Sequence, residues 1–512
     1  MGVFVQGKQA QSLERLRLAA RRVTPRPAPP AKLGVTAPKP GWLILFFDLC
    51  WLAGLLILTL YISWVYDKLP AGDPVEYHTY AVAFWKATPS FHLFPKEYPP
   101  LALIPFSLTL FPASSVHFYW VFAFWMGVIV CLSYLWFARV ISRPKAIAYA
   151  LYLLVGAMGT LLMRFDVLPA LVTLGALLLA ERKRFGWAYA LLAIGVLLKL
   201  YPGFLVPVLA AYQWRVSALP QAARAADGLD GDQTLARLWG MLWAGKAVRQ
   251  AQMRELGRRG KSIVSGLAVF TGVTFFGFSV PALVNLQGTL SEFKYALTRP
   301  IQIESAPATL LWLGNLLGFP TRPNVSFVSL NLVGPLDSAI KLLSMEALIG
   351  GTLYVCWRVL RGKLTLGQAF VAMIGVVLVS NKLLSPQYLM WILPLVAYVE
   401  GLDALWLVIC ALTTLIFPFI YQTHHPIITV PDNPAFFPTI ALRNLLLVIA
   451  TVRAVRGRRP ATAGQAPAEA EAHLRLPALP DSVPARERVP TLLYDRLSEE
   501  ERQRLIKTTS QV

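Results

Sequence analysis

The stretch VHFYWVFAFWMGVIVCLSYLWFA, residues 116–138, is apolar from end to end and contains no Asp, Glu, Lys or Arg. An α-helix needs about 20 such residues to cross the roughly 30 Å hydrocarbon layer of a bilayer. Long apolar runs recur along the chain, at 42–65, 263–285, 342–357, 403–420 and 436–452. This repetition predicts a helical protein that crosses a membrane many times.

The composition favours the same fold class. Of the 512 residues, 56% are hydrophobic, and the mean hydropathy is +0.54. This content is too apolar for a single soluble core, because soluble domains are about half apolar. We therefore expect an all-α polytopic membrane protein with roughly 10–13 transmembrane helices.

The formal net charge of +21 is concentrated in a few segments. Basic residues crowd into the N-terminal tail and into 181–184, 215–261 and 453–459. Cytoplasmic segments of membrane proteins carry such an excess of Lys and Arg, so the charge indicates orientation and not nucleic-acid binding. We expect no nucleic-acid partner, a cell-membrane location and both termini in the cytoplasm.

These patterns divide the chain into three parts. We expect residues 1–40 to form a basic cytoplasmic tail and residues 41–453 to form the transmembrane domain. Residues 454–512 are rich in Ala, Pro and charge, which predicts a largely disordered cytoplasmic tail. Within the domain we expect a first outer loop at 66–98 and a cytoplasmic amphipathic insert at 215–261.

The stretch 100–112 is apolar but short for a span, and Pro112 ends it. It either crosses a locally thinned bilayer or re-enters the membrane from outside. Re-entry fits the charge pattern better, because Arg139, Arg143 and Lys145 then lie in the cytoplasm. We therefore expect re-entrant or juxtamembrane helices in the first outer loop.

The four cysteines, Cys50, Cys131, Cys356 and Cys410, all lie inside apolar runs and far from the spacing of metal ligands. Buried small hydrophobic side chains are the simpler interpretation. We expect neither a metal nor another cofactor.

Ionisable groups at membrane depth cost on the order of several kcal/mol unless they find a partner or a function. Here they gather in five polar segments that the basic flanks place on the outer face. The segments are 73–80 together with 96–100, then 163–166, 198–203, 293–305 and 381–388. Their convergence on one face favours a functional site over isolated pairs that hold helices together.

The residue types suit the transfer of a sugar to a hydroxyl group, which needs a carboxylate to accept the hydroxyl proton. Glu76, just outside the first helix, is the candidate base, and Asp73 is the alternative. Fixed cations stabilise a phosphate leaving group as its negative charge grows. The candidate cations are Arg164, Lys199, Arg299 and Lys382.

Other side chains in the same segments are candidates for substrate binding. Aromatic rings offer a stacking face to a sugar, and amide and hydroxyl groups can hydrogen-bond its hydroxyls. These candidates are Tyr77, Tyr80, Glu97, Tyr98, Asp166, Tyr201, Gln387 and Tyr388.

Five short motifs follow one another in order between about residue 40 and about residue 400. They are Glu76-Tyr77 with Tyr80, then Glu97-Tyr98-Pro99-Pro100-Leu101, Arg164-Phe165-Asp166, Lys199-Leu200-Tyr201-Pro202, and Asn381-Lys382 with Ser385-Pro386-Gln387-Tyr388. In this order they resemble glycosyltransferase family 87. They are also similar to motifs of the catalytic subunit of GPI mannosyltransferase I.

The resemblance implies the GT-C architecture and an active site outside the cytoplasm. It implies transfer of a hexose or pentose, commonly mannose, from a polyprenyl-phosphate sugar donor to a lipid or glycan acceptor. Membrane lipids are the remaining partners, and we expect a monomer.

The resemblance also locates the catalytic carboxylate, because the family carries Asp-x-Asp or a single Asp in the first outer loop. Aligned through Tyr98-Pro99-Pro100, that position falls on Glu76, and Pro74 stands where a first Asp would be. Asp73 is one residue out of register, so either Glu76 or Asp73 is the base. The loss of paired carboxylates disfavours a bound divalent metal, which requires several oxygen ligands.

Two other classes fit part of the pattern. A transporter or lipid flippase would use the charges as a translocation path, although transporters usually show broken helices at corresponding positions of two halves. Here the charges gather at one face. The third interpretation, suggested by the missing first Asp, is a scaffold subunit whose catalytic residues have decayed.

Overall fold

The computed structural model describes residues 46, 48–54, 57, 61, 73–86, 95, 98–111, 117–217, 246–424 and 426–457. All of these except Gly457 belong to one compact unit that ends at Arg456. The expected tails at 1–40 and beyond 457, and most of the insert expected at 215–261, lie outside the described residues.

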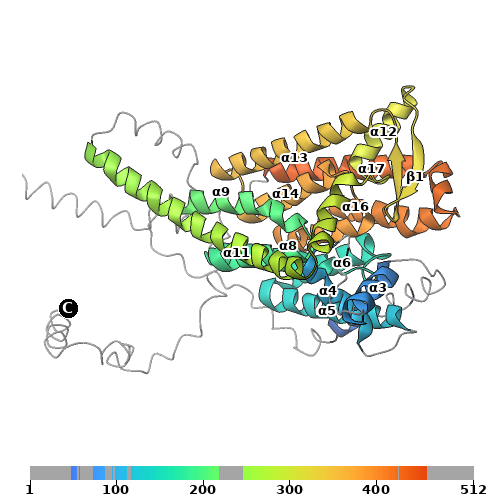
Figure 1. Ribbon diagram of the computed structural model, residues 1–512, viewed down its shortest axis with the longest axis horizontal. Coiled ribbons are helices and arrows are strands. Elements are labelled where there is room, and N and C mark those ends of the chain that lie inside the picture. The colour runs from blue at the N-terminus through green and yellow to red at the C-terminus, as the bar shows by residue number, and fades with distance from the viewer. Residues whose placement is uncertain are drawn as a thin grey trace, which may run out of the picture. The chain divides into compact units, whose positions relative to one another are not determined.

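The described part is almost entirely helical (Figure 1). Its first half contains α3 (Asp73–Lys86), η1 (Pro100–Ala102), α4 (Leu103–Ser107), η2 (Leu108–Leu110), α5 (Phe118–Trp136), η3 (Phe137–Ile141), α6 (Arg143–Gly156), α7 (Val167–Glu181), α8 (Phe185–Leu198), η4 (Tyr201–Leu205) and α9 (Val206–Ser217).

Its second half contains α11 (Lys246–Thr298), α12 (Ala306–Leu316), β1 (Arg322–Ser326), β2 (Ser329–Val333), α13 (Asp337–Leu360), α14 (Leu366–Ser380), η5 (Pro386–Trp391), α15 (Leu393–Val399), α16 (Ala404–Thr414), η6 (Leu415–Ile420), η7 (Ile427–Asp432) and α17 (Phe436–Arg456). The strands β1 and β2 pair as one antiparallel hairpin.

By length and composition, four helices of the described part can cross a membrane: Phe118–Ile141, Arg259–Tyr295, Asp337–Leu360 and Phe436–Arg456. Shorter apolar helices accompany them at Pro100–Leu110, Val167–Glu181, Phe185–Leu198, Leu366–Ser380, Pro386–Val399 and Ala404–Ile420. The helical fold class and the presence of candidate membrane spans agree with the sequence. The total of 10–13 spans and the GT-C architecture stay predictions.

Helix α14 forms the centre of the packing. A capping box starts it, in which the Thr365 side chain accepts from the backbone N–H of Gln368 and the Gln368 side chain accepts from that of Thr365. From Leu366 to Ser380 nearly every residue is buried, against α13, α15 and α17. A helix that is apolar all round is buried on all sides, as this one is.

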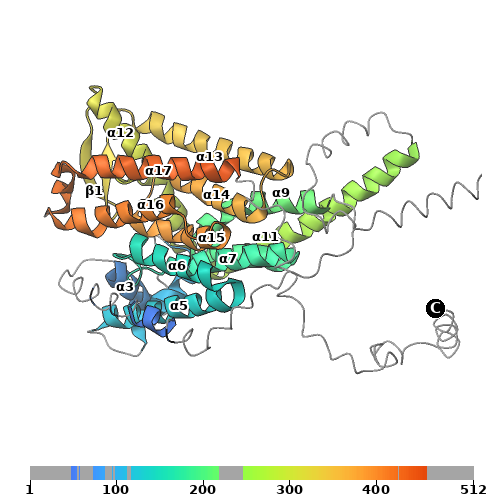
Figure 2. The same cartoon turned by 180° about the vertical axis from the view of Figure 1, so that it is seen from behind.

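The helices run back and forth between two ends (Figures 1 and 2). Gly367, Glu181 and Val399 pack together at one end, which we call the basic end. Basic residues crowd there, at Arg139, Arg143, Lys145, Arg182, Lys183, Arg184, Arg358, Arg361, Lys363, Arg453 and Arg456.

The opposite end, which we call the hairpin end, carries the β1–β2 hairpin and the connecting segments 157–166, 199–205, 299–305, 381–391 and 421–435. Four of the five polar segments predicted from the sequence begin or end there. The fifth, 73–80, joins them through α3, as the contacts below show.

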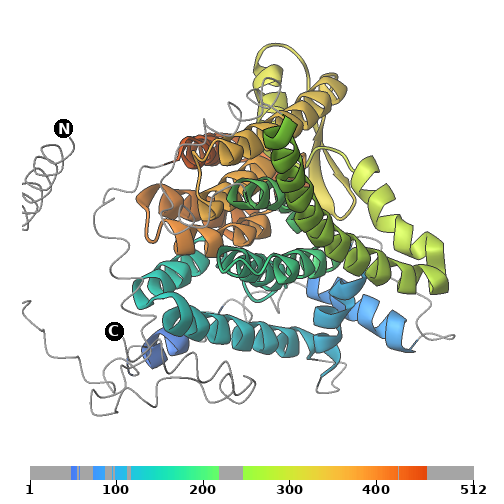
Figure 3. The same cartoon turned by 90° about the vertical axis from the view of Figure 1, so that its left-hand side faces the viewer.

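Helix α11 runs obliquely past the other helices, and its first turns extend beyond them (Figures 1 and 3). It lies directly against α8, where a Cβ on Gly266 would come within 2.3 Å of the Tyr189 ring and one on Gly277 within 2.3 Å of Leu197. Pro281 and the non-helical backbone of Asn285 kink α11 at the start of its C-terminal third. The kink separates the part that packs on α8 from the part that leads to the hairpin end.

Candidate functional site

Helix α3 presents one face to the rest of the site. Asp73, Glu76, Tyr77 and Tyr80 follow the i, i+3, i+4, i+7 spacing that puts side chains on one side of a helix. The Asp73 carboxylate forms an ion pair with Arg164, and the two side chains are only 15% and 20% exposed. The first and second predicted segments therefore meet.

Tyr77 is fully buried and anchors this face. Its ring stacks on Phe106 at 4.2 Å between centroids and meets the edges of Tyr98 and Phe165, both at 5.8 Å. Tyr80 stacks on the same Phe106 ring at 6.2 Å. The tyrosines predicted to bind substrate thus hold α3 against the Tyr98 and Phe165 segments.

Lys199 and Asp166 form a buried ion pair, with 2.5 Å between Nζ and Oδ1. Asp166 precedes α7 and Lys199 follows α8, and each helix stops there for a local reason. The backbone of Lys199 is extended, and Pro202 and Gly203 then force a short 3-10 turn in place of a continued helix. The break brings a lysine to the side of an aspartate that is 33 residues away in sequence.

Trp391 completes the environment of Asp166. Its indole Nε1 donates to the same Oδ1 atom at 2.6 Å, while Oδ2 is buried and forms no hydrogen bond with any described residue. The Trp391 ring stacks on Tyr201 at 4.3 Å and on Tyr388 at 4.1 Å. Segment 381–391, from the second half of the chain, is thereby joined to Asp166 and Tyr201 from the first half.

Aromatic rings surround the Lys199 ammonium group. Nζ lies 5.8 Å from the centre of Tyr98, 5.2 Å from Phe165 and from Tyr388, and 5.3 Å from Trp391. Ring faces attract a cation, most strongly where water is excluded. We call Asp73, Tyr77, Tyr98, Arg164, Phe165, Asp166, Lys199, Tyr201, Tyr388 and Trp391 the Lys199 cluster.

The Lys199 cluster combines two cations, two carboxylates and a wall of aromatic rings. Such a set can hold an anionic group against Arg164 and Lys199 and stack a sugar ring on the aromatic side chains. The buried Asp166 Oδ2, to which no described residue donates, is a further acceptor for a donor group of a ligand.

Two predicted cations lie elsewhere. Lys382 donates to the carbonyl oxygens of Leu297 and Arg299, at 3.0 and 2.8 Å, at the C-terminal end of α11. The Arg299 guanidinium lies over the Tyr295 ring. Neither side chain forms a hydrogen bond, ion pair or ring contact with a described residue of the Lys199 cluster, so the structure brings together Arg164 and Lys199 but does not join Arg299 and Lys382 to them.

The remaining predicted residues are Gln387, Glu76 and Glu97. Gln387 is buried and accepts from the hydroxyl of Ser385, within its own turn. Glu76 is half-buried on the face of α3 described above. Glu97 lies outside the described residues.

Two important side chains were not predicted. Trp391 lies three residues beyond the last motif in the sequence, and only the turn η5 brings it back to Asp166. Glu304 lies in a predicted segment, but its partners Tyr421 and Arg443 come from the end of the chain. The available signal for the pair of Glu304 and Arg443 was that Arg443 is a lone arginine inside the apolar run 436–452.

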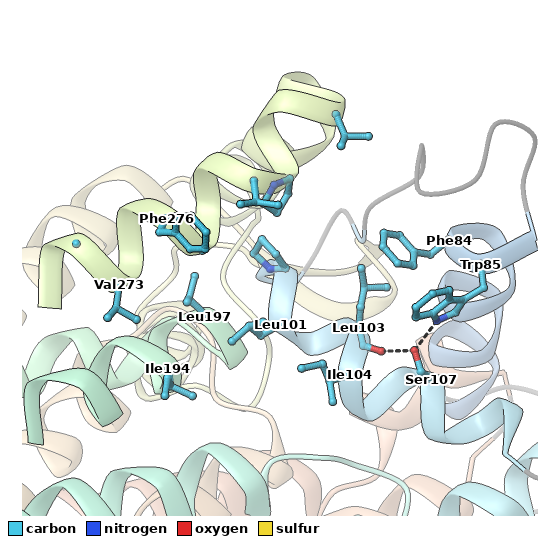
Figure 4. A pocket seen from close by; sticks show the side chains of 16 residues that line it. Phe84, Trp85, Leu101, Leu103, Ile104, Ser107, Ile194, Leu197, Val273 and Phe276 are labelled. Atoms are coloured by element: carbon cyan, nitrogen blue, oxygen red, sulfur yellow. Dashed lines mark hydrogen bonds between the residues drawn. The ribbon is translucent and has the colours of Figure 1, made fainter. Parts of the chain in front are cut away.

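An apolar cavity of about 800 Å³ lies next to the Lys199 cluster, between α3, the η1–α4 segment, α8 and α11 (Figure 4). Leu197 in its wall is two residues before Lys199, and Pro100 is two residues after Tyr98. Its other lining residues include Phe84, Trp85, Leu101, Leu103, Ile104, Ile194, Gly272, Val273, Phe276 and Val284.

The cavity wall offers almost no polar group to a ligand. Its one hydroxyl, on Ser107, accepts from Trp85 Nε1 at 2.7 Å and donates to the Leu103 carbonyl at 2.6 Å. A ligand part that fits there must be apolar, because a polar group would lose its bonds to water without replacement.

Among the described residues, no three His, Cys, Asp or Glu side chains gather where they could hold a metal ion. No model of a known protein family matches the chain, and a search of curated proteins finds no relative.

Proposed function

We propose that the chain is an integral membrane glycosyltransferase of GT-C architecture. It transfers a hexose or pentose, with mannose as the first candidate, from a polyprenyl-phosphate donor to a lipid or glycan acceptor. The observation that carries the proposal is the position of the Lys199 cluster beside the apolar cavity. A charged site next to an apolar cavity fits a molecule with a phosphate at one end and a long hydrocarbon chain.

In the proposed reaction, the phosphate of the donor binds Arg164 and Lys199, and its sugar stacks on the aromatic rings of Tyr98 and Tyr388. The acceptor hydroxyl oxygen attacks the anomeric carbon from the opposite side. The bond from that carbon to the phosphate oxygen breaks, and its electron pair stays with the phosphate, whose charge the two cations stabilise. The anomeric configuration is inverted.

The proton of the acceptor hydroxyl goes to Glu76 in this proposal. Asp73 is the alternative base, but it forms an ion pair with Arg164. Glu76 lies on the same face of α3, one turn further on, and is half-buried. We assign Glu76 as the base because the alignment through Tyr98-Pro99-Pro100 puts the family's carboxylate there, and Asp73 as the residue that positions Arg164.

The distribution of charge supports an active site outside the cytoplasm. An excess of basic residues at the ends of membrane helices marks the cytoplasmic side, and here the end opposite to the polar segments carries more of the described basic residues. With the basic end inside, the Lys199 cluster faces the outer leaflet, where the donor is proposed to enter.

The test is a transfer assay with the purified full chain in a membrane and a set of polyprenyl-phosphate sugars. We expect consumption of one donor and its loss in Glu76→Gln, since the amide cannot accept the proton, while Asp73→Asn reduces the rate by weakening the hold on Arg164. His78→Gln, five residues after Asp73 and on another face of α3, is the matched control and should retain transfer. Full activity of Glu76→Gln would remove Glu76 as the base, and no consumption of any donor would count against the function.

A lipid flippase is the second candidate, because the same apolar cavity beside a buried ion pair would suit a translocated lipid. Movement of a fluorescent polyprenyl phosphate between leaflets, without any sugar transfer, would favour it. Transfer without such movement would exclude it as the main activity.

A further inference from the structure

At the hairpin end, Lys382 bonds to the backbone of Arg299 and lies near enough to Arg299 and Lys341 for their charges to act on it. We call the three residues the Arg299 cluster: Arg299 after α11, Lys341 near the start of α13 and Lys382 after α14. Lys382 is fixed by its bonds to the carbonyls of Leu297 and Arg299. Burial, and then the charges of Lys341 and Arg299, lower the pKa of Lys382.

Packing explains how Lys341 reaches the other two. Its neighbour Ile340 belongs to the same buried hydrophobic cluster as Ile301 and Ile303, which follow Arg299 in the chain. The backbone of Gln302 in turn donates to the carbonyl of Lys382 at 2.9 Å. The three segments are therefore held together by contacts other than those of the charged groups.

No acidic side chain of the described residues pairs with the Arg299 cluster. The acids closest in sequence are engaged elsewhere: Glu304 accepts from Tyr421 and faces Arg443, and Asp337 accepts from the backbone of Gly334. The carbonyls that end α11 favour the charge of Lys382, but the first turns of α13 offer no such stabilisation to Lys341. The fold gathers positive charge that no acidic side chain in the described part of the chain neutralises.

The Arg299 guanidinium is held from one side. Its Cζ lies 5.4 Å from the centre of the Tyr295 ring, and the Tyr295 hydroxyl donates to the Phe327 carbonyl at 2.9 Å, which fixes the ring. No described acceptor bonds to Nε, which is buried. A planar guanidinium supported in this way is suited to bind an oxyanion through two N–H groups.

We propose that Arg299, Lys341 and Lys382 form a second phosphate-binding site, separate from the Lys199 cluster, which takes the phosphate group of a membrane lipid. A phosphate carries several acceptor oxygens and enough charge to satisfy three cations at once. A lipid is favoured as its source because the last turns of α11 expose apolar side chains: Leu290 is 50%, Phe293 40% and Leu297 81% exposed. The proposal does not require sugar transfer to occur.

The test uses the full chain in nanodiscs of a zwitterionic phospholipid, with phosphatidic acid as the lipid probe and inorganic phosphate as the soluble probe. Native mass spectrometry counts bound lipid, and the melting temperature is followed in parallel. We expect saturable binding of phosphatidic acid that weakens roughly tenfold in Lys341→Gln and in Arg299→Gln. Lys382 is left intact because it also closes the end of α11.

One control locates the effect. Lys294→Gln removes an exposed lysine of α11, the helix that Arg299 follows, and should bind as the wild type does. Binding of phosphatidic acid alone identifies a lipid headgroup, and equal protection by inorganic phosphate identifies free phosphate as sufficient.

The proposal is overturned by no binding beyond that of zwitterionic lipid, or by an equal loss of binding in Lys294→Gln. Neither of these results bears on whether the Lys199 cluster transfers sugar.

Discussion

Asp166 connects the two halves of the Lys199 cluster through a single oxygen atom. Oδ1 accepts from Lys199 Nζ and from Trp391 Nε1, so the ion pair and the indole depend on each other. Removing one partner of a buried, charged hydrogen bond leaves the other unsatisfied, which costs more than the bond itself contributes. Trp391 is for this reason a positioning residue, although no motif includes it.

We predict that Trp391→Phe lowers the free energy of unfolding by about 2 kcal/mol more than Trp406→Phe does. Trp406 is the matched control because it is also buried but its Nε1 bonds to no residue that the structure describes, so both changes leave a similar space and only one removes a bond. The free energies of unfolding of the two variants, measured in detergent micelles, give the difference. Equal losses would mean that the indole bond to Asp166 contributes nothing.

Glu304 is the second buried carboxylate of the hairpin end. Burial raises its pKa to about 7, against the opposing effects of the Arg443 charge and of the hydrogen bond from Tyr421. The Arg443 guanidinium lies 4.0 Å from Glu304 Oε2 and donates to its backbone carbonyl at 2.6 Å. The pair holds segment 299–305 to α17.

We predict that stability falls as the pH rises from about 4.5 to about 7, because a raised folded-state pKa stabilises the fold only while the group stays protonated. The loss is on the order of 3 kcal/mol, and the contribution of Glu304 is constant above that window. Melting curves from pH 4.5 to 8 for the wild type and Glu304→Gln measure it, since the amide cannot ionise. The same slope in both proteins would contradict the assignment to Glu304.

At the scale of elements, the apolar runs predicted the helices and the polar interruptions predicted their ends. Lys199-Leu200-Tyr201-Pro202 ends α8, and Arg164-Phe165-Asp166 precedes α7, as the motifs indicate. The sequence could not reveal that Lys382 binds the carbonyls of α11, because that contact joins residues 83 positions apart. It also could not reveal the cavity, which depends on the oblique path of α11 over α8.

Helix α11 offers a direct test of the cavity. Gly272 lines it, and a Cβ added there would meet no atom within 4 Å, so a larger side chain can enter the cavity without distorting the helix. We predict that Gly272→Leu keeps the fold and weakens binding of a polyprenyl phosphate, while binding of a water-soluble short-chain analogue is unchanged.

Gly257→Leu is the matched control on α11, since its added atoms also meet no neighbour and it lies outside the cavity. Binding of the long-chain lipid is compared with that of the short analogue in both variants. If Gly272→Leu binds both lipids as the wild type does, the cavity does not hold the hydrocarbon chain.

At the scale of the whole molecule, the two ends of the helices differ in their charge. The helices alternate between the two ends, and more of the described basic residues lie at the basic end than at the hairpin end, which holds the buried pairs of Asp73, Asp166 and Glu304. This separation follows from physics that acts on the chain during insertion, because moving Lys and Arg across the bilayer is unfavourable. The side on which each end lies is therefore a testable consequence of the sequence.

We predict that the hairpin end lies outside and the basic end inside. Val328 in the β1–β2 turn is 79% exposed, and Lys363 is exposed in the turn between α13 and α14, so a single cysteine at either position can react without disturbing the core. In a background without the four native cysteines, an impermeant maleimide added to intact cells should label Val328→Cys. It should label Lys363→Cys only after the membrane is opened. Labelling of both from outside, or the reverse pattern, would contradict an outward-facing Lys199 cluster, because the connecting segments that form it lie on the same end as the hairpin.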